Sequence, residues 1–532
     1  MFNNEIDRFG SAAFADERQV RAAGAFKAAP DSLFLGYLGN RPLIHSGAGG
    51  ALLVAGARSG KLSTILGRNL CYGTATACTF VTLDMKGELY AISQNQTPDQ
   101  KYCIGWNPAG LHGLPQHRIN PVDYICADSP TLVSDVKVFC ENMIPPSGAA
   151  QSVYFEGRAR EFLEGIILTE VRRSGTLTLP KLYEIINLIP GNTDTWLEFA
   201  WLMNQSGFPI SVRIEEEIAA SRENPSNGFQ GILGELFKAF ACLSDPILLT
   251  SVSPPYDFSF ADLCHGDRRW QVYLMPPAEF VSAWSPVIKA MFVAGMIYKS
   301  RNPSAPRQTW VLDECAQLGA FPLVIKLFTY GAGIGIRPWA IFQATQQMRQ
   351  LGPNAETIIT SSAAVRSYFG IRDIESATAL SRMLGAQTLQ YDDEAQQAQA
   401  RLAKSQAMQS LLMGEDPLAV GVAYKHHSMA AERQTKMHRL LRTPDEILST
   451  PHDKQYIFYD GLASPIYADR RPYYEERSMA GLFHPNPYHP PVNKVRVRSA
   501  WGHTWRSVVT EPVPERFSQY PQYKDGYWSR VE

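Results

Sequence analysis

Short runs of consecutive apolar residues recur along the chain, and each run ends at a polar or small residue. Six of these runs are 51–55, 78–84, 270–276, 309–314, 339–344 and 365–370. Unbroken apolar runs of this length are typical of strands covered on both faces, as in a parallel sheet. Segments with helical spacing, such as 61–70 and 375–385, stand between them. The alternation predicts an α/β fold with a mainly parallel central sheet.

A long segment without strand-like runs interrupts this alternation. Between 150 and 262, apolar residues recur every three or four positions, as in "GRAREFLEGIILTEVRRSG", which predicts amphipathic helices. The simplest explanation is an all-helical domain inserted between two strands of the sheet. Such a domain either takes part in function or is a packing appendage, and the pattern leaves both open.

Two later segments also depart from the strand-helix alternation. Residues 386–435 are polar and rich in Gln and Ala, which predicts an exposed helix or a mobile insertion. From about residue 470 the chain is rich in Pro, Tyr, Trp and Arg without periodicity, and we expect an irregular extension that wraps the domain or meets a partner. The predicted parts are a lead-in (1–50), a first part of the sheet domain (51–149), the all-helical domain (150–262), a second part of the sheet domain (263–470) and the extension (471–532).

Composition and charge are those of an ordinary globular protein. The 532 residues are 45% hydrophobic and 19% charged, with a formal net charge of −1, so any contact with DNA must come from local basic patches. The eight cysteines show no metal-binding spacing, which favours reduced thiols in a cytoplasmic protein. No apolar run reaches the ~18 residues needed to cross a bilayer.

The stretch "VAGARSGKLST" (54–64) resembles a phosphate-binding loop. A strand that leads through a glycine-rich turn into a helix directs backbone N–H groups at one point and forms an anion cradle. Lys61 would supply a positive charge for the β- and γ-phosphates. Leu62 cannot bind Mg²⁺, which leaves Ser63, Thr64 or a water molecule for that role. The predicted phosphate-binding residues are Ala57, Arg58, Ser59, Gly60, Lys61 and Leu62.

Two other predicted strands end in polar residues that complete this site. "WVLDE" ends in Asp313 and Glu314, and "IFQA" offers Gln343. We expect Asp313 to bind Mg²⁺ with Ser63, and Glu314 to activate the attacking water. Gln343 would sense whether the γ-phosphate is present. Because ligands bind at the carboxyl ends of strands in open α/β sheets, the sequence predicts a nucleotide site for ATP and Mg²⁺ there.

Several motifs, in order, resemble the TraG/TraD-type coupling ATPases of conjugation and type IV secretion. They are "FGSAAFADERQVRAAG", "LLVAGARSGK", "VTLDMKGELY", "INPVDYI", "VLDECAQLG", "YGAGIGIRPWAIFQATQQM", "YFGIRDIESATALSRMLG" and "RLLRTPDEIL". The resemblance covers residues 10 to about 475. In "VTLDMKGELY" the matching residues of the family's Asp-x-Lys-Gly-Glu segment are Asp84, Lys86, Gly87 and Glu88.

The resemblance implies a RecA-like P-loop NTPase that carries an all-helical domain and assembles as a homo-oligomer, usually a hexamer. Such a protein recruits a relaxase–DNA complex or secreted proteins and passes them to type IV secretion channel components. It implies a cytoplasmic location, peripheral to the inner face of the cell membrane. Basic residues of the helical domain, such as Arg158, Arg160, Arg172 and Arg173, would then contact phosphates or belong to a solvated face.

The sequence departs from the family at two points. Relatives usually carry amino-terminal transmembrane helices, so here either a separate membrane-anchor subunit supplies the anchor or the sequence starts after a removed segment. Ala332 stands where some relatives have an arginine that acts across the subunit interface. Arg337 or Arg372 could replace that arginine, or hydrolysis is slow.

Two other functions are compatible with parts of the sequence. One is a docking platform with weak or no hydrolysis, in which the helical domain and the tail recruit cargo. Leu62 and Ala332 favour this function, whereas Lys61 and the Asp313–Glu314 pair oppose it. The other is a free DNA pump of the FtsK kind, which explains the missing anchor but neither "DMKGELY" nor "RTPDEIL".

Overall fold

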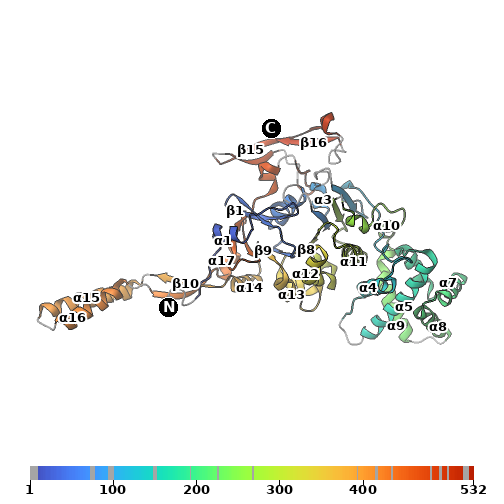
Figure 1. Ribbon diagram of the computed structural model, residues 1–532, viewed down its shortest axis with the longest axis horizontal. Helices are drawn as coiled ribbons and strands as arrows, with labels where there is room; N and C mark the ends of the chain where they lie inside the picture. Colours follow the sequence, from blue (N-terminus) through green and yellow to red (C-terminus); the bar gives the residue numbers. More distant parts are fainter. Residues whose placement is uncertain are drawn as a thin grey trace. The chain divides into compact units, whose positions relative to one another are not determined.

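A large, mainly parallel β-sheet is the central element of the computed structural model (Figure 1). The structure describes residues 10–71, 78–93, 101–147, 152–191, 193–223, 227–266, 269–391, 393–413, 417–432, 435–479, 482–489, 494–499, 502–518 and 526–531. Among these residues, eleven strands share the sheet. In spatial order they are β2 (Arg41–His45), β1 (Leu33–Leu38), β13 (Ile466–Asp469), β12 (Lys454–Tyr459), β9 (Val365–Phe369), β3 (Ala51–Ala55), β8 (Ile336–Phe342), β7 (Gln308–Asp313), β4 (Thr79–Leu83), β6 (Arg269–Leu274) and β5 (Lys101–Trp106).

The six strands expected from apolar runs are confirmed as β3, β4, β6, β7, β8 and β9. With β5 they form the parallel part of the sheet, and most of their residues are buried because helices cover both faces of such a sheet. The α/β class with a mainly parallel sheet is therefore confirmed. The pattern missed β12, β13, β1 and β2, which extend the sheet beyond β9. β1 pairs antiparallel with both β2 and β13, and β12 pairs antiparallel with β9.

The register of the parallel strands brings their carboxyl ends to one edge of the sheet. Val54 of β3 pairs with Phe342 of β8, and Asp313 of β7 pairs with Ile341 of β8. On the other side of β7, Leu312 pairs with Leu83 of β4. The residues that follow β3, β8, β7 and β4 are therefore neighbours in space although they are far apart in the sequence.

Helices surround this sheet and belong to the same compact unit, which comprises residues 17–370, 452–461 and 467–532. Those outside the predicted all-helical segment are α1 (Glu17–Ala22), α2 (Gly67–Cys71), α3 (Glu88–Ser93), α4 (Leu132–Met143), α11 (Ser285–Arg301), α12 (Pro322–Ile334) and α13 (Ala355–Ser362). No helix among the described residues is both long enough and apolar enough to span a lipid bilayer.

The described residues between 152 and 251 are mainly helical, as the spacing of the apolar residues predicts. The helices are α5 (Ser152–Ser174), α6 (Leu179–Leu188), α7 (Asp194–Gln205), α8 (Pro209–Glu223), α9 (Asn227–Phe240) and α10 (Pro246–Ser251). The long helix α5 is central, because α4 and α6 to α9 all pack against it (Figure 1). Its buried face includes Phe162, Leu163, Ile166 and Ile167. The boundaries 150–262 of the all-helical domain stay a prediction.

A smaller compact unit comprises residues 1–16, 371–451 and 462–466. Its elements are α14 (Ile374–Leu384), β10 (Ala386–Tyr391), α15 (Glu394–Leu412), α16 (Pro417–Glu432), β11 (Thr435–Leu440) and α17 (Pro444–Leu448). The segment 386–435, expected to be an exposed helix or a mobile insertion, contains two helices that pack side by side (Figure 1). β10 precedes these two helices and β11 follows them, and the two strands pair antiparallel. Because both strands are short and polar, the sequence pattern did not predict them.

The tail contains more regular structure than the sequence predicts. Three antiparallel strands, β14 (Lys494–Ser499), β15 (Gly502–Pro512) and β16 (Tyr527–Val531), form a separate sheet. The expectation of an irregular extension over 471–532 is therefore wrong for these strands. The alternation in "KVRVRS" (494–499) was a strand signal, and the high Pro and aromatic content around it concealed the pattern.

Candidate functional site

The glycine-rich segment after β3 forms a tight turn that leads into a helix. The Gly56 N–H donates to the Phe369 carbonyl (3.3 Å), and the Ser59 N–H donates to the Gly56 carbonyl (3.2 Å). Gly60 has a φ of 85°, a conformation that glycine adopts without steric cost. The helix starts with one π-helical turn, Leu62–Leu66. This is the strand-turn-helix arrangement that an anion cradle requires, although the Ser59 N–H is already used inside the turn.

Lys61 lies between the two predicted carboxylates. Its Nζ donates to Asp313 Oδ1 and to Glu314 Oε1, both at 2.8 Å. Gln343 Nε2 donates to the same Glu314 oxygen at 3.0 Å. The side chains of Lys61, Asp313 and Glu314 are only 18–20% exposed. The structure thus brings together the residues that the sequence placed at three separate strand ends.

The backbone of Glu314 is in an unusual conformation. Its φ is 51°, in the left-handed region that non-glycine residues rarely occupy. A hydrogen bond from Gln317 Nε2 to Glu314 Oε2 (3.0 Å) fixes the carboxylate from the other side. Strained backbone of this kind is held by its surroundings and is frequent at functional sites. The carboxylate is consequently held in place by Lys61, Gln317 and Gln343.

The two carboxylic acids have opposite pKa shifts. Burial raises the pKa of Asp313, although the Lys61 ammonium opposes that shift. Burial also acts to raise the pKa of Glu314, but the Lys61 ammonium and the hydrogen bonds from Lys61 and Gln343 outweigh it and hold the pKa below its usual value. Glu314 is therefore ionised at neutral pH, as a residue that orients or deprotonates water must be.

Asp84 is a third acid at this edge of the sheet. It follows β4 directly, is 4% exposed, and accepts a hydrogen bond from the Tyr90 N–H through Oδ2 (2.9 Å). Burial raises its pKa to about 7, and the neighbouring Asp313 and Glu88 carboxylates add to the shift. The sequence identified Asp84 as part of a family motif but not as part of the site.

Replacing Asp84 by Asn is expected to change the pH dependence of stability. The folded protein keeps a proton on Asp84 from about pH 4 to about pH 7 that the unfolded chain has lost. The free energy of unfolding therefore falls as pH rises through this range, by about 1.4 kcal/mol for each unit of pKa difference. Asp84→Asn removes this contribution.

Urea unfolding at pH 5, 6, 7 and 8, without nucleotide or Mg²⁺, measures the effect. The stability of Asp84→Asn relative to the parent should increase from pH 5 to pH 8. The exposed Asp128→Asn is the matched control and should keep the parental slope. Equal slopes for Asp84→Asn and the parent would show that Asp84 is already ionised at pH 5.

The residues after Lys61 occupy different environments. Thr64 is 6% exposed, and its hydroxyl donates to the Gly60 carbonyl at 2.8 Å. The Ser63 hydroxyl donates to the same carbonyl at 3.2 Å and faces the cavity that Asp313 lines. Leu62 packs against a buried cluster of apolar side chains from α2, α3 and the tail. Ser63 is therefore the better-placed hydroxyl for a metal ion, and the leucine has a packing role.

Arg470, which was not predicted as a site residue, stabilises the turn by hydrogen bonds. Its Nη1 donates to the Ser59 carbonyl (2.9 Å) and to the Thr64 hydroxyl (3.1 Å), and its Nη2 donates to the His452 carbonyl. The guanidinium stacks on the Phe369 ring at 3.6 Å. Burial lowers the pKa of Arg470 to about 10. A buried arginine held this way fixes the shape of the turn, so we regard it as a positioning residue.

A cavity of about 710 Å³ opens in front of the turn. The turn, Asp313 and Glu314 line it together with residues of the tail and with Asp84, Met85, Lys86, Glu88 and Leu89. The volume is within the range of small-molecule sites, and the side chains combine a cation, carboxylates and apolar surface. Asp313 and Ser63 offer the oxygen ligands that Mg²⁺ prefers. The residues present therefore fit a nucleoside triphosphate with Mg²⁺.

Other predicted arginines have different places in the structure. Arg337 is fully buried, and it donates to the Thr309 hydroxyl and to the Asp31 and Gly47 carbonyls. It therefore cannot replace an arginine that acts across a subunit interface, and that expectation is wrong. Arg372 is exposed, as is Ala332, and for Arg372 the role stays a prediction.

The arginines of the helical segment are mostly engaged within it. Arg158 pairs with Glu161 and Glu217, and Arg173 pairs with Glu170. Arg160 donates to the Ile144 carbonyl at 2.7 Å. Exposed Arg172 is the one of the four for which the described residues show no such partner. Phosphate contact by these residues stays a prediction.

Comparison with known proteins agrees with this geometry. Residues 5–418 match the family model described as type IV secretory system conjugative DNA transfer. Two conjugal transfer proteins TraG of Escherichia coli are 24% identical over 487 residues and 23% identical over 486 residues. Each match covers 84% of this chain, and the two matches cover 71% and 72% of those proteins.

Solved structures of the plasmid coupling protein TrwB have the same fold. The structure of TrwB in complex with ADP and Mg²⁺ gives a TM-score of 0.59 at 14% identity and covers 87% of this chain and 96% of that chain. The structure with a non-hydrolysable ATP analogue gives a TM-score of 0.58 at 15% identity and the same coverage. The predicted fold, a mainly parallel central sheet with an inserted all-helical part, is confirmed by these similarities.

Proposed function

The chain belongs to the type IV secretory system conjugative DNA-transfer family, and on that basis we propose that it is a coupling ATPase. It recruits DNA, as a relaxase complex, or protein substrates to a type IV secretion channel. It uses ATP hydrolysis to drive their transfer. The observation that carries the proposal is the position of Lys61 between Asp313 and Glu314 at the mouth of the cavity, with Gln343 on the Glu314 carboxylate.

Each residue of this group has a distinct task in hydrolysis. Lys61 leaves the two carboxylates and binds the β- and γ-phosphate oxygens. Asp313 and the Ser63 hydroxyl would hold Mg²⁺, which would neutralise charge on the phosphates. Glu314 accepts a proton from the attacking water or orients it, and Gln343 senses the γ-phosphate through the Glu314 carboxylate. Arg470 keeps the turn in shape throughout.

Assembly and location follow from the family. TraG is named a conjugal transfer protein and TrwB a plasmid coupling protein. For this chain we propose a homo-oligomer, a hexameric ring in which a neighbouring subunit completes each site. The ring would lie on the cytoplasmic side at the inner face of the cell membrane. A separate membrane-anchor subunit would connect it to the channel.

The proposed function predicts an ATPase that depends on assembly. The rate of phosphate release per subunit should rise with protein concentration, because dilution separates subunits that share a site. Single-stranded DNA should increase the rate further if DNA is the cargo. The test is the ATPase rate over a hundredfold range of protein concentration, with and without single-stranded DNA. A rate per subunit that stays constant would contradict a shared site.

A docking platform without hydrolysis remains the second candidate. Two observations favour it: Leu62 packs on the tail where Mg²⁺-binding loops have a hydroxyl, and Ala332 is an exposed alanine where some relatives have an arginine. In this case nucleotide binding would hold the chain in one conformation while the helical segment and tail recruit cargo. The Glu314→Gln variant discriminates between the two functions.

A further inference from the structure

Residues of the carboxyl-terminal tail also line the cavity in front of the phosphate loop, and we call them the tail wall. They are Tyr473, Tyr474, Asn486, His489, Lys494 and Trp505. All of them come after β13, the last strand of the central sheet. The same cavity is lined by the loop, Met85 and Leu89. A ligand whose phosphates bind the loop would therefore have its remaining part between Leu62, Met85 and Leu89 on one side and the tail on the other.

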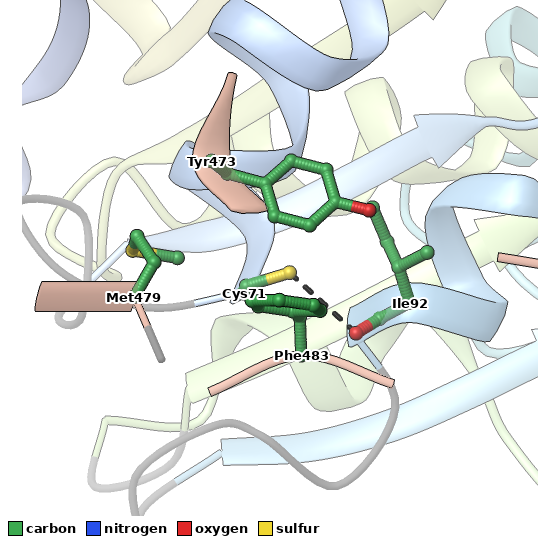
Figure 2. Packing of buried hydrophobic residues seen from close by; sticks show 5 residues of the cluster. All are labelled: Cys71, Ile92, Tyr473, Met479 and Phe483. Atoms are coloured by element: carbon green, nitrogen blue, oxygen red, sulfur yellow. Dashed lines mark hydrogen bonds between the residues drawn. The ribbon is translucent and has the colours of Figure 1, made fainter. Parts of the chain in front are cut away.

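The tail is firmly attached at this position. Tyr473, Met479 and Phe483 pack with Cys71 of α2 and Ile92 of α3 in one buried cluster (Figure 2). The rings of Tyr473 and Phe483 meet edge to face, with centroids 4.8 Å apart. Because these side chains are almost completely buried, their packing stabilises the attachment of the tail more than a surface contact would.

Two further contacts connect the tail to segments that line the site. Asn486 is 7% exposed, and its Nδ2 donates to Glu88 Oε2 at 3.0 Å. Leu62, the residue after the phosphate-binding lysine, packs against the same tail cluster, as does Tyr474. The tail wall is consequently connected to both the helix after the loop and the "DMKGE" segment. A conformational change in either segment would therefore move the tail wall.

Two aromatic residues of this wall, Trp505 and Tyr474, are less buried than Tyr473. Trp505 is 62% exposed, and Tyr474 is half-buried, although both line the cavity. Exposed aromatic faces beside a phosphate-binding turn are suited to stacking on a nucleobase, since every base has a π-face. Lys494, also exposed and in the same cavity, adds positive charge near the sugar and phosphates. Together the side chains have the composition of a base-binding surface.

We propose that Tyr474 and Trp505 of the tail form the base-binding wall of the nucleotide site. The inference rests on the proposed nucleotide site and goes beyond it, since it makes the tail a component of that site. The triphosphate is bound by the loop and Lys61, whereas the base is held between the tail aromatics and the apolar side chains of Leu62, Met85 and Leu89. The leucine after Lys61 thus helps to build the base pocket.

The experiment separates the contribution of the base from that of the phosphates. The full chain is titrated calorimetrically, in the presence of Mg²⁺, with the non-hydrolysable ATP analogue AMP-PNP and with inorganic tripolyphosphate, which has no base. The parent should bind AMP-PNP at least about tenfold more tightly than tripolyphosphate. Tyr474→Ala and Trp505→Ala should each weaken AMP-PNP about tenfold and leave tripolyphosphate affinity unchanged.

Conservative and control variants complete the design. Trp505→Phe and Tyr474→Phe keep an aromatic face and should retain most of the AMP-PNP affinity. Tyr527→Ala removes an exposed aromatic residue of β16 that does not line the cavity and should bind both ligands like the parent. Because Trp505 is mostly exposed, Trp505→Ala carries the test even if Tyr474→Ala fails to fold.

The possible failures are distinguishable. If the parent binds neither ligand, the nucleotide site itself is wrong, and the proposed function with it. If the parent binds both ligands equally, or if both alanine variants bind AMP-PNP like the parent, the tail does not bind the base while the nucleotide site stands. Equal losses for AMP-PNP and tripolyphosphate would also overturn the inference, because the tail would then act only by shaping the loop.

Discussion

Replacing Glu314 by Gln is expected to lower ATP hydrolysis by at least about 100-fold while nucleotide binding stays close to that of the parent. Glutamine has nearly the same shape, and its carbonyl oxygen can still accept the hydrogen bonds that Lys61 Nζ and Gln343 Nε2 donate to Glu314 Oε1. What it lacks is the negative charge and the ability to accept a proton from water. The variant therefore separates binding from chemistry.

Two measurements on the Glu314→Gln variant are needed. Steady-state phosphate release gives the catalytic loss, and calorimetric titration with AMP-PNP shows that the site is intact. Glu356→Gln is the matched control, because this glutamate forms a surface ion pair with Arg349 (2.7 Å) in the same compact unit. It should hydrolyse ATP like the parent.

The same variant decides between the motor and the docking platform. A motor that cannot hydrolyse ATP should fail to transfer cargo, whether DNA or protein. If Glu314→Gln supports transfer as well as the parent does, hydrolysis is not needed and the protein is a platform. If the parent itself releases phosphate no faster than Glu314→Gln, the catalytic role of Glu314 is contradicted directly.

The centre of the site could be predicted from the sequence because its signals are local. An apolar run that ends in Asp313–Glu314 and another that ends before Gln343 are each visible within a few residues. The rule that parallel strands end at one edge then places both beside the loop. This inference needs no knowledge of distant contacts, and the hydrogen bonds from Lys61 to Asp313 and Glu314 in the structure agree with it.

The supports of the site could not be predicted in this way. Arg470 donates a hydrogen bond to the Ser59 carbonyl across 411 positions of the sequence, and no local pattern distinguishes it from the adjacent Arg471. The raised pKa of Asp84 depends on burial and on the nearby Asp313, which belongs to another strand. The tail aromatics resembled an irregular extension because their partners, Cys71 and Ile92, lie about 400 residues earlier.

The strands β12 and β13 show a related limit. Each combines polar and apolar residues and is only partly buried, so neither has the unbroken apolar run of β3 or β7. The turn that Arg470 supports depends on these strands, because the arginine directly follows β13. Local patterns therefore identify the chemistry of the site better than they identify the scaffold that holds it.

Replacing Lys61 by Met should have the largest effect on binding. The ammonium is the charge closest to both carboxylates, and its loss removes the charge-assisted contacts to the phosphates. We expect AMP-PNP affinity to fall on the order of 100-fold. The exposed Lys326→Met, on α12, is the control for loss of a positive charge and should bind AMP-PNP like the parent.

The same variant should also be less stable than the parent, and more so at high pH. Lys61 lowers the pKa of Asp313 and of Glu314, so without it the burial of both groups raises their pKa values. The folded state would then keep protons that the unfolded chain loses above about pH 4, and stability would fall as pH rises. Removing one partner of a buried ion pair costs about 3 kcal/mol.

Thermal unfolding of Lys61→Met and the parent at pH 5 and pH 8, without Mg²⁺, measures this difference. The loss of stability should be clearly larger at pH 8, where the unpaired carboxylates must ionise, than at pH 5. A loss that is the same at both values would mean that packing of the lysine side chain, rather than its charge, stabilises the apo site. A larger loss at pH 8 would show that Lys61 has two roles. It neutralises Asp313 and Glu314 before nucleotide binds, and it neutralises the phosphates when nucleotide is bound.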